Sequence, residues 1–415
     1  MARIAIARQF GDIQDLELVD QPVTEPGAGQ LRIAVRAAAI NPADLKQLRG
    51  MFGRSEKSLP LRLGSEVSGV VTAVGPDAVG PAGPIAVGDE VVGYPVRGGF
   101  ASELLVKASS VLPKPARLGW GQAAGLLVGA VTAFHLVEAV GLTEGDRVIV
   151  HGATGNVGRA VVQLARLRGA EVIGTVSAAH EEELRELGAV PVLYGPGLEE
   201  RLHALLPRGA DAALDTVGTD EALDASIALV SDRHRIATIA GFARGAELGI
   251  QLLGGGAGAD PGTELRGKAR LPLLTLAADR RLAGPPVISF PLEQVREAMT
   301  LVGSGHAGGK VVLLPEEPPD GVVRREWQTE RMSADTDPNG TDPNDTDPID
   351  TGANASGNQS DSAVTWDSVD SGQSEDIENS LTAQGTSDRE TTREVSRDEL
   401  VEEAERARLK RSGQV

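Results

Sequence analysis

The residues best placed to bind a ligand form a glycine-rich turn at 152–158, Gly-Ala-Thr-Gly-Asn-Val-Gly. The apolar run at 147–151 reads as a strand before it, and apolar residues at helical spacing predict a helix over 157–168. A strand, a glycine turn and a helix N-terminus present backbone N–H groups and a positive dipole end to a pyrophosphate. We therefore expect a dinucleotide-binding site, with the N–H groups of Asn156 and Val157 as hydrogen-bond donors to the pyrophosphate.

The turn departs from the usual G-x-G-x-x-G fingerprint, because Ala153 stands in the place of the first glycine. An ordinary tight turn between a strand and a helix would use the same residue types. His151, at the end of the expected strand, is equally compatible with packing under a cofactor and with a pyrophosphate contact. The expected site consists of Gly152, Thr154, Gly155, Asn156, Val157 and Gly158.

Metal and thiol chemistry find little support in the composition. The chain has no cysteine, which excludes disulfides, thiol nucleophiles, iron–sulfur clusters and cysteine-based zinc sites. No two of its histidines form a pair at ligand spacing; they lie at 135, 151, 180, 203, 234 and 306. We expect no bound metal ion, and the absence of cysteine suits a cytoplasmic location.

The length of 415 residues favours about two domains with additional segments. Of the net charge of −19, residues 316–415 carry −15, from 25 acidic and 10 basic residues, and residues 1–315 carry −4, from 34 and 30. Neither part has the basic stripe of a nucleic-acid-binding protein, so no nucleic-acid partner is expected. No apolar run approaches the length of a membrane span and no secretory signal is visible, so no membrane partner is expected.

The segments around the turn show two patterns of expected secondary structure, one of short strands and one of alternating strands and helices. Residues 1–119 contain short alternating strands with glycine and proline at the corners, which is typical of a small barrel-like β domain. Over 120–284, expected strands and helices alternate, which indicates an α/β fold with a doubly wound parallel sheet. Residues 285–315 return to the first pattern and should pack back onto the first domain, making it discontinuous. Ligands of such sheets bind beyond the carboxyl ends of the strands, where the glycine turn lies.

The acidic C-terminal segment has a different composition. Thr-Asp-Pro occurs three times between 336 and 348, and aliphatic residues are sparse over 316–395. Such a segment buries too little apolar surface to offset the entropy of ordering, so a disordered tail is expected. Residues 396–411 carry a capping-box pattern and good helix formers, which predict a short terminal helix. No catalytic constellation is visible in this segment, and its partner is unknown.

Nine short segments occur in order over about 1–314: Ala39-Ile-Asn-Pro-Ala-Asp44, Leu63-Gly-Ser-Glu-Val-Ser-Gly-Val-Val71, Val87-Gly-Asp-Glu-Val-Val-Gly93, Gly99-Phe-Ala-Ser-Glu103, Gly129-Ala-Val-Thr-Ala133, the turn at 152–158, Leu187-Gly-Ala189, Leu214-Asp-Thr-Val-Gly218 and Gly309-Lys-Val-Val-Leu313. Together they make the chain resemble the medium-chain dehydrogenase/reductase superfamily, in its zinc-independent quinone oxidoreductase branch. The resemblance implies a GroES-like catalytic domain over 1–119 and 285–315, a Rossmann NAD(P)-binding domain over 120–284 and a cleft between them. Zinc-dependent relatives have Gly-His-Glu where this chain has Gly64-Ser65-Glu66.

The expected cofactor is NADP(H). The expected strand at 171–176 ends without the carboxylate that would bond a ribose 2′-hydroxyl, so a 2′-phosphate is not repelled there. Ser177 can donate to that phosphate or simply cap a helix, and the resemblance places Tyr194 beside it. The three glutamates at 181–183 depart from the basic residue that relatives often have.

The resemblance also implies the remaining site residues, each with a plainer alternative. Asn41 would contact the nicotinamide or form an Asx turn before Pro42. Asp44 would relay protons or cap a helix. Tyr94 would bond a substrate carbonyl or pack in the interior. Lys310 would lie near the cofactor or be a strand-edge charge. Thr132 and the residues after two strands should line the nicotinamide side; these are Thr216, Val217, Gly218, Ala240 and Gly241.

The resemblance implies hydride transfer from NADPH to a quinone or to an α,β-unsaturated carbonyl. Without a zinc ion to polarise an alkoxide, reduction of an activated alkene is more plausible than alcohol oxidation. An enoyl-thioester reductase of polyketide type remains open as a sister function. An NADP-binding regulatory protein, with the acidic tail as its partner-binding segment, remains open from another class. A homodimer is expected from the family.

Overall fold

The computed structural model describes residues 1–305, 307–315 and 325–326. The disordered segment expected over 316–395 and the helix expected over 396–411 otherwise lie outside these residues. Arg325–Glu326 differs from that expectation, since it forms strand β19 and pairs with β17 (Val287–Pro291). None of the helices within the described ranges combines the length and the apolar character needed to cross a membrane.

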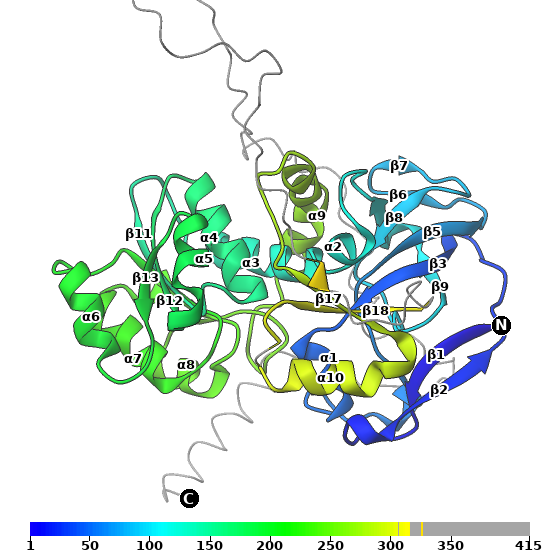
Figure 1. Ribbon diagram of the computed structural model, residues 1–415, viewed down its shortest axis with the longest axis horizontal. Coiled ribbons are helices and arrows are strands. Elements are labelled where there is room, and N and C mark those ends of the chain that lie inside the picture. The colour runs from blue at the N-terminus through cyan, green and yellow to red at the C-terminus, as the bar shows by residue number, and fades with distance from the viewer. Residues whose placement is uncertain (306, 316–324, 327–415) are drawn as a thin grey trace, which may run out of the picture. The chain divides into compact units, whose positions relative to one another are not determined.

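One sheet is parallel throughout and has the strand order β13-β12-β11-β14-β15-β16. Strands β11, β12 and β13 of this sheet are labelled in Figure 1. Its strands, in chain order, are β11 (Arg147–His151), β12 (Glu171–Val176), β13 (Val190–Leu193), β14 (Ala212–Asp215), β15 (Ile236–Thr238) and β16 (Gln251–Leu252). Strand β11 is central, and Val148 through His151 are buried. This explains its nearly continuous apolar sequence, because a central parallel strand has no face toward water.

Helices cover both faces of the parallel sheet. They are α3 (Leu127–Ala139), α4 (Asn156–Leu167), α5 (Glu181–Glu186), α6 (Leu198–Leu205), α7 (Asp220–Leu229), α8 (Phe242–Leu248) and α9 (Thr263–Ala278). Val148 and Val150 of β11 belong to the cluster with α3, α4 and α9, whereas Ile149 belongs to the cluster with α6 and α7. The alternation of a strand therefore divides the core into two layers.

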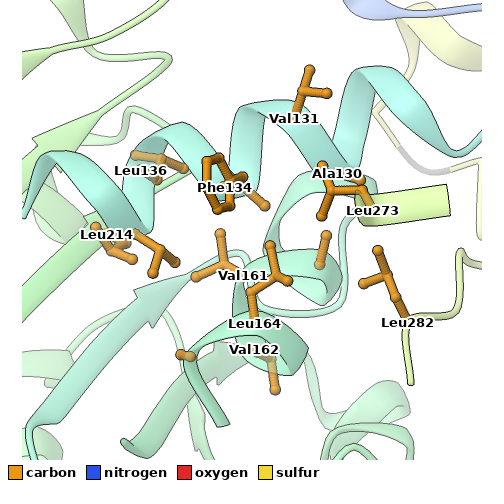
Figure 2. Packing of buried hydrophobic residues seen from close by; sticks show 14 of the residues in the cluster. Ala130, Val131, Phe134, Leu136, Val161, Val162, Leu164, Leu214, Leu273 and Leu282 are labelled. Atoms are coloured by element: carbon orange, nitrogen blue, oxygen red, sulfur yellow. The ribbon is translucent and has the colours of Figure 1, made fainter. Parts of the chain in front are cut away.

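Helix α3 is at the centre of the larger cluster. Figure 2 shows its Ala130 and Phe134 on the side that faces Val161 and Leu164 of α4 and its Val131 on the opposite side, with Leu273 of α9 close to Ala130. Residues 129–137 of α3 are all buried. A helix that is apolar on every side must be packed on every side. This helix is therefore a rigid support for the groups attached to its N-terminus.

The second sheet is mixed and has the strand order β10-β8-β5-β3-β18-β17-β19, with β9 also paired to β3. Its remaining strands are β3 (Gln30–Ala39), β5 (Val67–Val74), β8 (Glu90–Gly93), β9 (Glu103–Lys107), β10 (Val111–Pro113) and β18 (Lys310–Leu314). Strand β18 pairs with β3 although some 270 residues separate them. Residues near the end of the described chain thus complete a sheet that begins near its start.

Smaller elements flank the mixed sheet. Strands β2 (Leu16–Gln21), β1 (Ala2–Ala7) and β4 (Leu61–Arg62) form a three-stranded sheet, and β6 (Val79–Gly80) pairs with β7 (Gly83–Pro84). The helices are α1 (Pro42–Leu48), α2 (Trp120–Ala124) and α10 (Val295–Gly303). Helices α2 and α3 follow each other closely and are separated near Gly125. A Cβ atom at Gly125 would lie 2.6 Å from Cγ of Lys310, so the lysine side chain crosses the helix junction there.

Candidate functional site

The glycine turn lies at the carboxyl end of β11, and two of its glycines have internal reasons to be glycine. Gly152 has φ +73°, and its N–H donates to Oγ1 of Thr175 at 3.1 Å. A Cβ atom at Gly158 would lie 2.1 Å from the carbonyl oxygen of Gly152. Gly152 therefore permits the left-handed turn, and Gly158 permits α4 to pack against it.

Gly155 is less tightly constrained by the protein than these two glycines. It is the N-cap of α4 with φ −67°, a conformation open to any residue. A Cβ atom there would make one tight contact, 3.3 Å from the Gly152 carbonyl oxygen. The missing side chain leaves open the space above the first N–H groups of α4, which no side chain of the N-cap residue fills. That space and the helix dipole fit a pyrophosphate group, which needs a close backbone approach.

The loops after β14 and β15 are held together by a buried pair, Asp215 and Thr238. The Thr238 hydroxyl donates to Asp215 Oδ2 at 2.5 Å. Asp215 also accepts from the N–H groups of Val217 and Gly218, each at 3.0 Å, and Thr238 Oγ1 accepts from those of Ala240 and Gly241. This network brings together the residues expected to line the nicotinamide side. The Thr216 hydroxyl donates to the His151 carbonyl at 2.7 Å and so ties them to the glycine turn.

His151 is a fully buried packing residue. Its Nε2 lies 3.0 Å from Oγ of Ser226 on α7, and that hydroxyl donates to the Ala222 carbonyl. The imidazole must therefore carry its proton on Nε2, since the serine proton is already used. Burial lowers the pKa of His151 to about 4, although nearby Asp215 opposes this. The ring is neutral and lies in the core rather than at the surface of the turn.

The end of β12 carries groups suited to a phosphate. The Ser177 hydroxyl lies 2.9 Å from Nδ1 of His180, and the exposed Tyr194 follows the neighbouring strand β13. The three nearby glutamates are engaged by arginines: Glu181 and Glu182 pair with Arg185, and Glu183 pairs with Arg159. These ion pairs offset the acidic charge that the sequence places beside this position.

Three buried side chains from distant parts of the chain form a ring, which we call the Glu66 ring. Nζ of Lys310 donates to Oδ1 of Asn41 at 2.6 Å and to Oε1 of Glu66 at 2.8 Å. Nδ2 of Asn41 donates to the same Glu66 oxygen at 3.1 Å. The other oxygen, Oε2, accepts from the N–H of Val128 in the first turn of α3 at 2.9 Å. The ring therefore joins the mixed sheet to the helix that carries Thr132, which is itself buried.

Asp44 caps α1 at the edge of the Glu66 ring. Its carboxylate accepts from the N–H of Asn41 at 2.7 Å and from that of Gly64 at 3.1 Å. Burial raises the pKa of Asp44 to about 6, against the opposing effect of these hydrogen bonds and of Lys310. Of the two roles open from the sequence, the contacts of Asp44 are those of a cap.

Tyr94 follows β8 and faces two arginines of α9. Its pKa is raised by burial, whereas Arg266, through its charge and a side-chain hydrogen bond, and Arg270, through its charge, oppose the rise. Nη1 of Arg270 donates to the carbonyl of Tyr94 at 2.7 Å and to that of Ser109 at 3.1 Å. Sequence reasoning did not identify Arg266, Arg270 or the ring position of Glu66. The Gly-Ser-Glu run was the only available signal, and it pointed to Glu66.

The donor set at Glu66 does not fit a zinc ion. Both oxygens of Glu66 accept hydrogen bonds from protein donors, and an ammonium group lies against one of them. No cluster of three His, Cys, Asp or Glu side chains occurs among the residues that the structure describes. No thiolate is present in the chain to complete such a site.

Two family models match the chain. Residues 27–116 match the alcohol dehydrogenase GroES-like domain, and residues 156–254 match the zinc-binding dehydrogenase family. The first covers most of the mixed sheet, and the second begins at α4 and ends after β16. The second family's description mentions zinc, whereas the described residues around Glu66 do not fit a zinc site.

Individual proteins give the same picture. The NorB protein of the spectinabilin polyketide synthase system of Streptomyces orinoci is 33% identical over 332 residues, which is 75% of this chain and 14% of NorB. The chain therefore spans about a seventh of that relative. A quinone oxidoreductase from Coxiella burnetii has a TM-score of 0.64 at 26% identity, over 76% of this chain and 99% of that one. Mycobacterial Rv1454c, solved with NADPH, has a TM-score of 0.66 at 27% identity, over 76% and 100%.

Proposed function

The chain belongs to the medium-chain dehydrogenase/reductase superfamily, in its quinone-oxidoreductase-like branch, and from this premise we propose that it is a zinc-independent, NADPH-dependent reductase of quinones or α,β-unsaturated carbonyls. The observation that carries the cofactor assignment is Gly155, which as the N-cap of α4 brings no side chain over the first N–H groups of that helix and so leaves them open to a close ligand. Such a position at the N-terminus of α4 suits the pyrophosphate of a dinucleotide.

NADPH is favoured over NADH by the end of β12. Ser177 stands where a carboxylate would select the 2′-hydroxyl of NADH, and His180 lies within hydrogen-bond reach of it. The neighbouring glutamates are paired with arginines, so their charge is partly offset. The complex of Rv1454c with NADPH supports the same choice.

The proposed reaction is a hydride transfer for which the chain's residues would hold and orient the cofactor. Bound NADPH would supply a hydride, and the turn at 152–158 would hold its pyrophosphate. The loops fixed by Asp215 and Thr238 would border the nicotinamide, and the Glu66 ring would keep α3 in register with the mixed sheet. When the β-carbon of the acceptor gains a hydride and its electron pair, negative charge develops on the carbonyl oxygen. Without a zinc ion, that charge requires hydrogen-bond donors from the protein.

Acyl thioesters are the second candidate substrates, and the observation that favours them is the similarity to NorB of a polyketide synthase system. An enoyl thioester has the same arrangement of an alkene conjugated to a carbonyl. The chemistry at the β-carbon is therefore unchanged, and only the room for the thioester arm differs.

Oxidation of NADPH in the presence of different acceptors tests the proposal. The acceptors are 1,2-naphthoquinone, 2-cyclohexenone and a crotonyl thioester, each compared with a blank lacking protein. Turnover of the quinone or the enone above the blank supports the first candidate, and selective turnover of the thioester supports the second. If NADPH binds but every rate equals the blank, the protein is a cofactor-binding protein without reductase activity.

A further inference from the structure

Arg266 lies between residues of the parallel sheet and residues of the mixed sheet. It belongs to α9, which packs against α3 (Figure 1), and it faces Tyr94, which follows strand β8 of the mixed sheet. Its Nη2 atom also lies near Gly254, where a built Cβ would be 3.8 Å away. Gly254 follows β16, so this guanidinium lies at the carboxyl edge of the parallel sheet. That edge also carries the glycine turn and the loops held by Asp215 and Thr238.

A chain of hydrogen bonds fixes the position of Arg266. Its Nε donates to Nδ1 of the buried His135 at 3.2 Å, and Nε2 of His135 lies 3.3 Å from Oδ2 of Asp260. Because Nδ1 must accept, the imidazole carries its proton on Nε2 and donates it to Asp260. Burial, followed by the charge of Arg266, lowers the pKa of His135, which favours this neutral form. The guanidinium is therefore anchored through Nε to His135.

One donor of this anchored group is unused. Nη2 of Arg266 is buried, and the described residues offer it no hydrogen-bond partner of ordinary geometry. A buried, charged N–H group without an acceptor is costly, so such groups are usually paired. The charged groups that act on the neighbouring Tyr94 hydroxyl are Arg266, Arg270 and Glu66, so the surroundings carry two positive charges and one negative charge. An oxygen with developing negative charge is the acceptor that suits this place.

We propose that Nη2 of Arg266, together with the Tyr94 hydroxyl, binds the carbonyl oxygen of the substrate and stabilises the enolate that hydride addition produces. The inference rests on the proposed function and extends it to the group that takes the charge. The hydride and its two electrons form the new C–H bond at the β-carbon, the alkene π pair becomes the bond between the α-carbon and the carbonyl carbon, and the carbonyl π pair moves to the oxygen. Tyr94 can give that oxygen its proton and regain one from water, while Arg266 stays protonated throughout.

A ligand that mimics the enolate separates this role from catalysis. The protein saturated with NADP⁺ is titrated with 4-nitrophenol, whose colour reports whether it is bound as the phenolate. In the wild-type protein we expect the pKa of the bound phenol to be lower than that of the free phenol. Arg266→Met should remove at least about one unit of that shift, and Arg266→Lys should restore part of it.

The control is Arg244→Met, which removes a partly exposed arginine of α8 paired with Asp224 and Glu247. It should leave the bound phenol's pKa unchanged. Thermal unfolding and NADPH affinity of each variant check the fold and the cofactor-binding site, and both should be unchanged in Arg266→Met. If Arg266→Met does not fold, Arg266→Gln and Arg266→Lys replace it.

Three results would overturn the inference. The first is a wild-type protein that does not lower the pKa of bound 4-nitrophenol, and the second is an unchanged shift in Arg266→Met. The third is a loss of NADPH affinity with an intact shift, which would place Arg266 on the cofactor. If instead the shift behaves as expected but no acceptor is turned over, the oxyanion site stands and the proposed reductase function fails. Where turnover is measurable, Arg266→Met should lower kcat about a hundredfold with little change in KM for NADPH.

Discussion

The Glu66 carboxylate accepts a 2.9 Å hydrogen bond from the backbone N–H of Val128, so a side chain beside the mixed sheet caps the first turn of α3. A negative charge at a helix N-terminus is favourable because it meets the positive end of the helix dipole. The same carboxylate is paired with Lys310, which keeps a fully buried charge compensated. One residue thus fixes the relation between the catalytic and the cofactor-binding parts of the proposed enzyme.

Glu66→Gln should destabilise the protein strongly. The amide removes the anionic partner of Lys310 and one of the two acceptor oxygens, which leaves an uncompensated buried ammonium. Breaking a buried ion pair in this way costs about 3–5 kcal/mol. Urea unfolding of the wild-type and variant proteins measures the difference.

The double variant Glu66→Gln/Lys310→Met tests the pairing itself. Removing both charges leaves neither of them buried alone, so the double variant should lose less stability than the sum of the two single losses. Simple additivity of the two losses would show that the contact in the Glu66 ring contributes no coupling energy.

Gly155→Ala should mainly reduce NADPH affinity, whereas Gly158→Ala should mainly reduce the stability of the fold. At 155 the new methyl group would make one tight contact, 3.3 Å from the Gly152 carbonyl oxygen, so stability should fall by only about 1 kcal/mol, while NADPH affinity falls at least tenfold because the methyl group blocks the pyrophosphate. At 158 it would lie 2.1 Å from a carbonyl oxygen, so stability should fall by at least about 1–3 kcal/mol. Fluorescence titration with NADPH and thermal unfolding distinguish the two. Wild-type affinity in both Gly155→Ala and the harsher Gly155→Asp would remove the turn from the cofactor site.

The free energy of unfolding of the Asp44→Asn variant should increase relative to that of the wild-type protein as the pH rises. The pKa of Asp44 is about 6 in the folded protein against an ordinary value of 3.8, so the folded state binds the extra proton between these values. The stability that this group contributes is therefore present below about pH 4 and is lost as the pH rises through about 6. A shift of about 2 units corresponds to about 3 kcal/mol. Urea unfolding of both proteins at pH 4 to 8 should show the variant gaining on the wild type by up to that amount, and parallel curves would contradict it.

Ser177→Glu should shift the cofactor preference from NADPH toward NADH. A carboxylate at the end of β12 can accept from a ribose 2′-hydroxyl but repels a 2′-phosphate. We expect the ratio of the two dissociation constants to change at least about tenfold. Ser177→Ala is the matched control, and it should weaken NADPH binding only modestly, because it removes a donor without adding a repulsive charge. An unchanged ratio in Ser177→Glu would place the 2′-phosphate elsewhere.

The sequence was most informative where local pattern and burial agree. Strand β11 and helix α4 were predicted to within one residue, because the strand is apolar throughout and the helix has one apolar face. Helix α9 was not predicted. Pro272 lies inside it and Gly267 weakens it, so its intrinsic preference is poor. It forms because buried residues of α9 such as Leu273 and Leu276 pack in the core with α3, which is a tertiary effect.

In the candidate site, too, contacts between residues far apart in the sequence could not be predicted. The sequence and its family resemblance placed Asn41 and Lys310 near the cofactor one by one, but could not show that both bind Glu66. Residues 41, 66 and 310 have no local relationship, and only the pairing of β18 with β3 brings them together. Arg266 lies outside the nine segments that carry the family resemblance, so no motif marked it. Its importance comes from an unused donor, which is visible only when its neighbours are known.

The position of Lys310 also sets an order of events during synthesis. Glu66 and Asn41 leave the ribosome long before Lys310, so a nascent chain ending before strand β18 holds an acidic group in its interior without the cation that compensates it. The mixed sheet also lacks β18 and β17 at that stage, so β3 has an open edge where β18 will later pair. The mixed sheet therefore begins with one of the first parts of the chain to be made but is completed only by a much later part. A product truncated before residue 310 should be unable to complete this sheet.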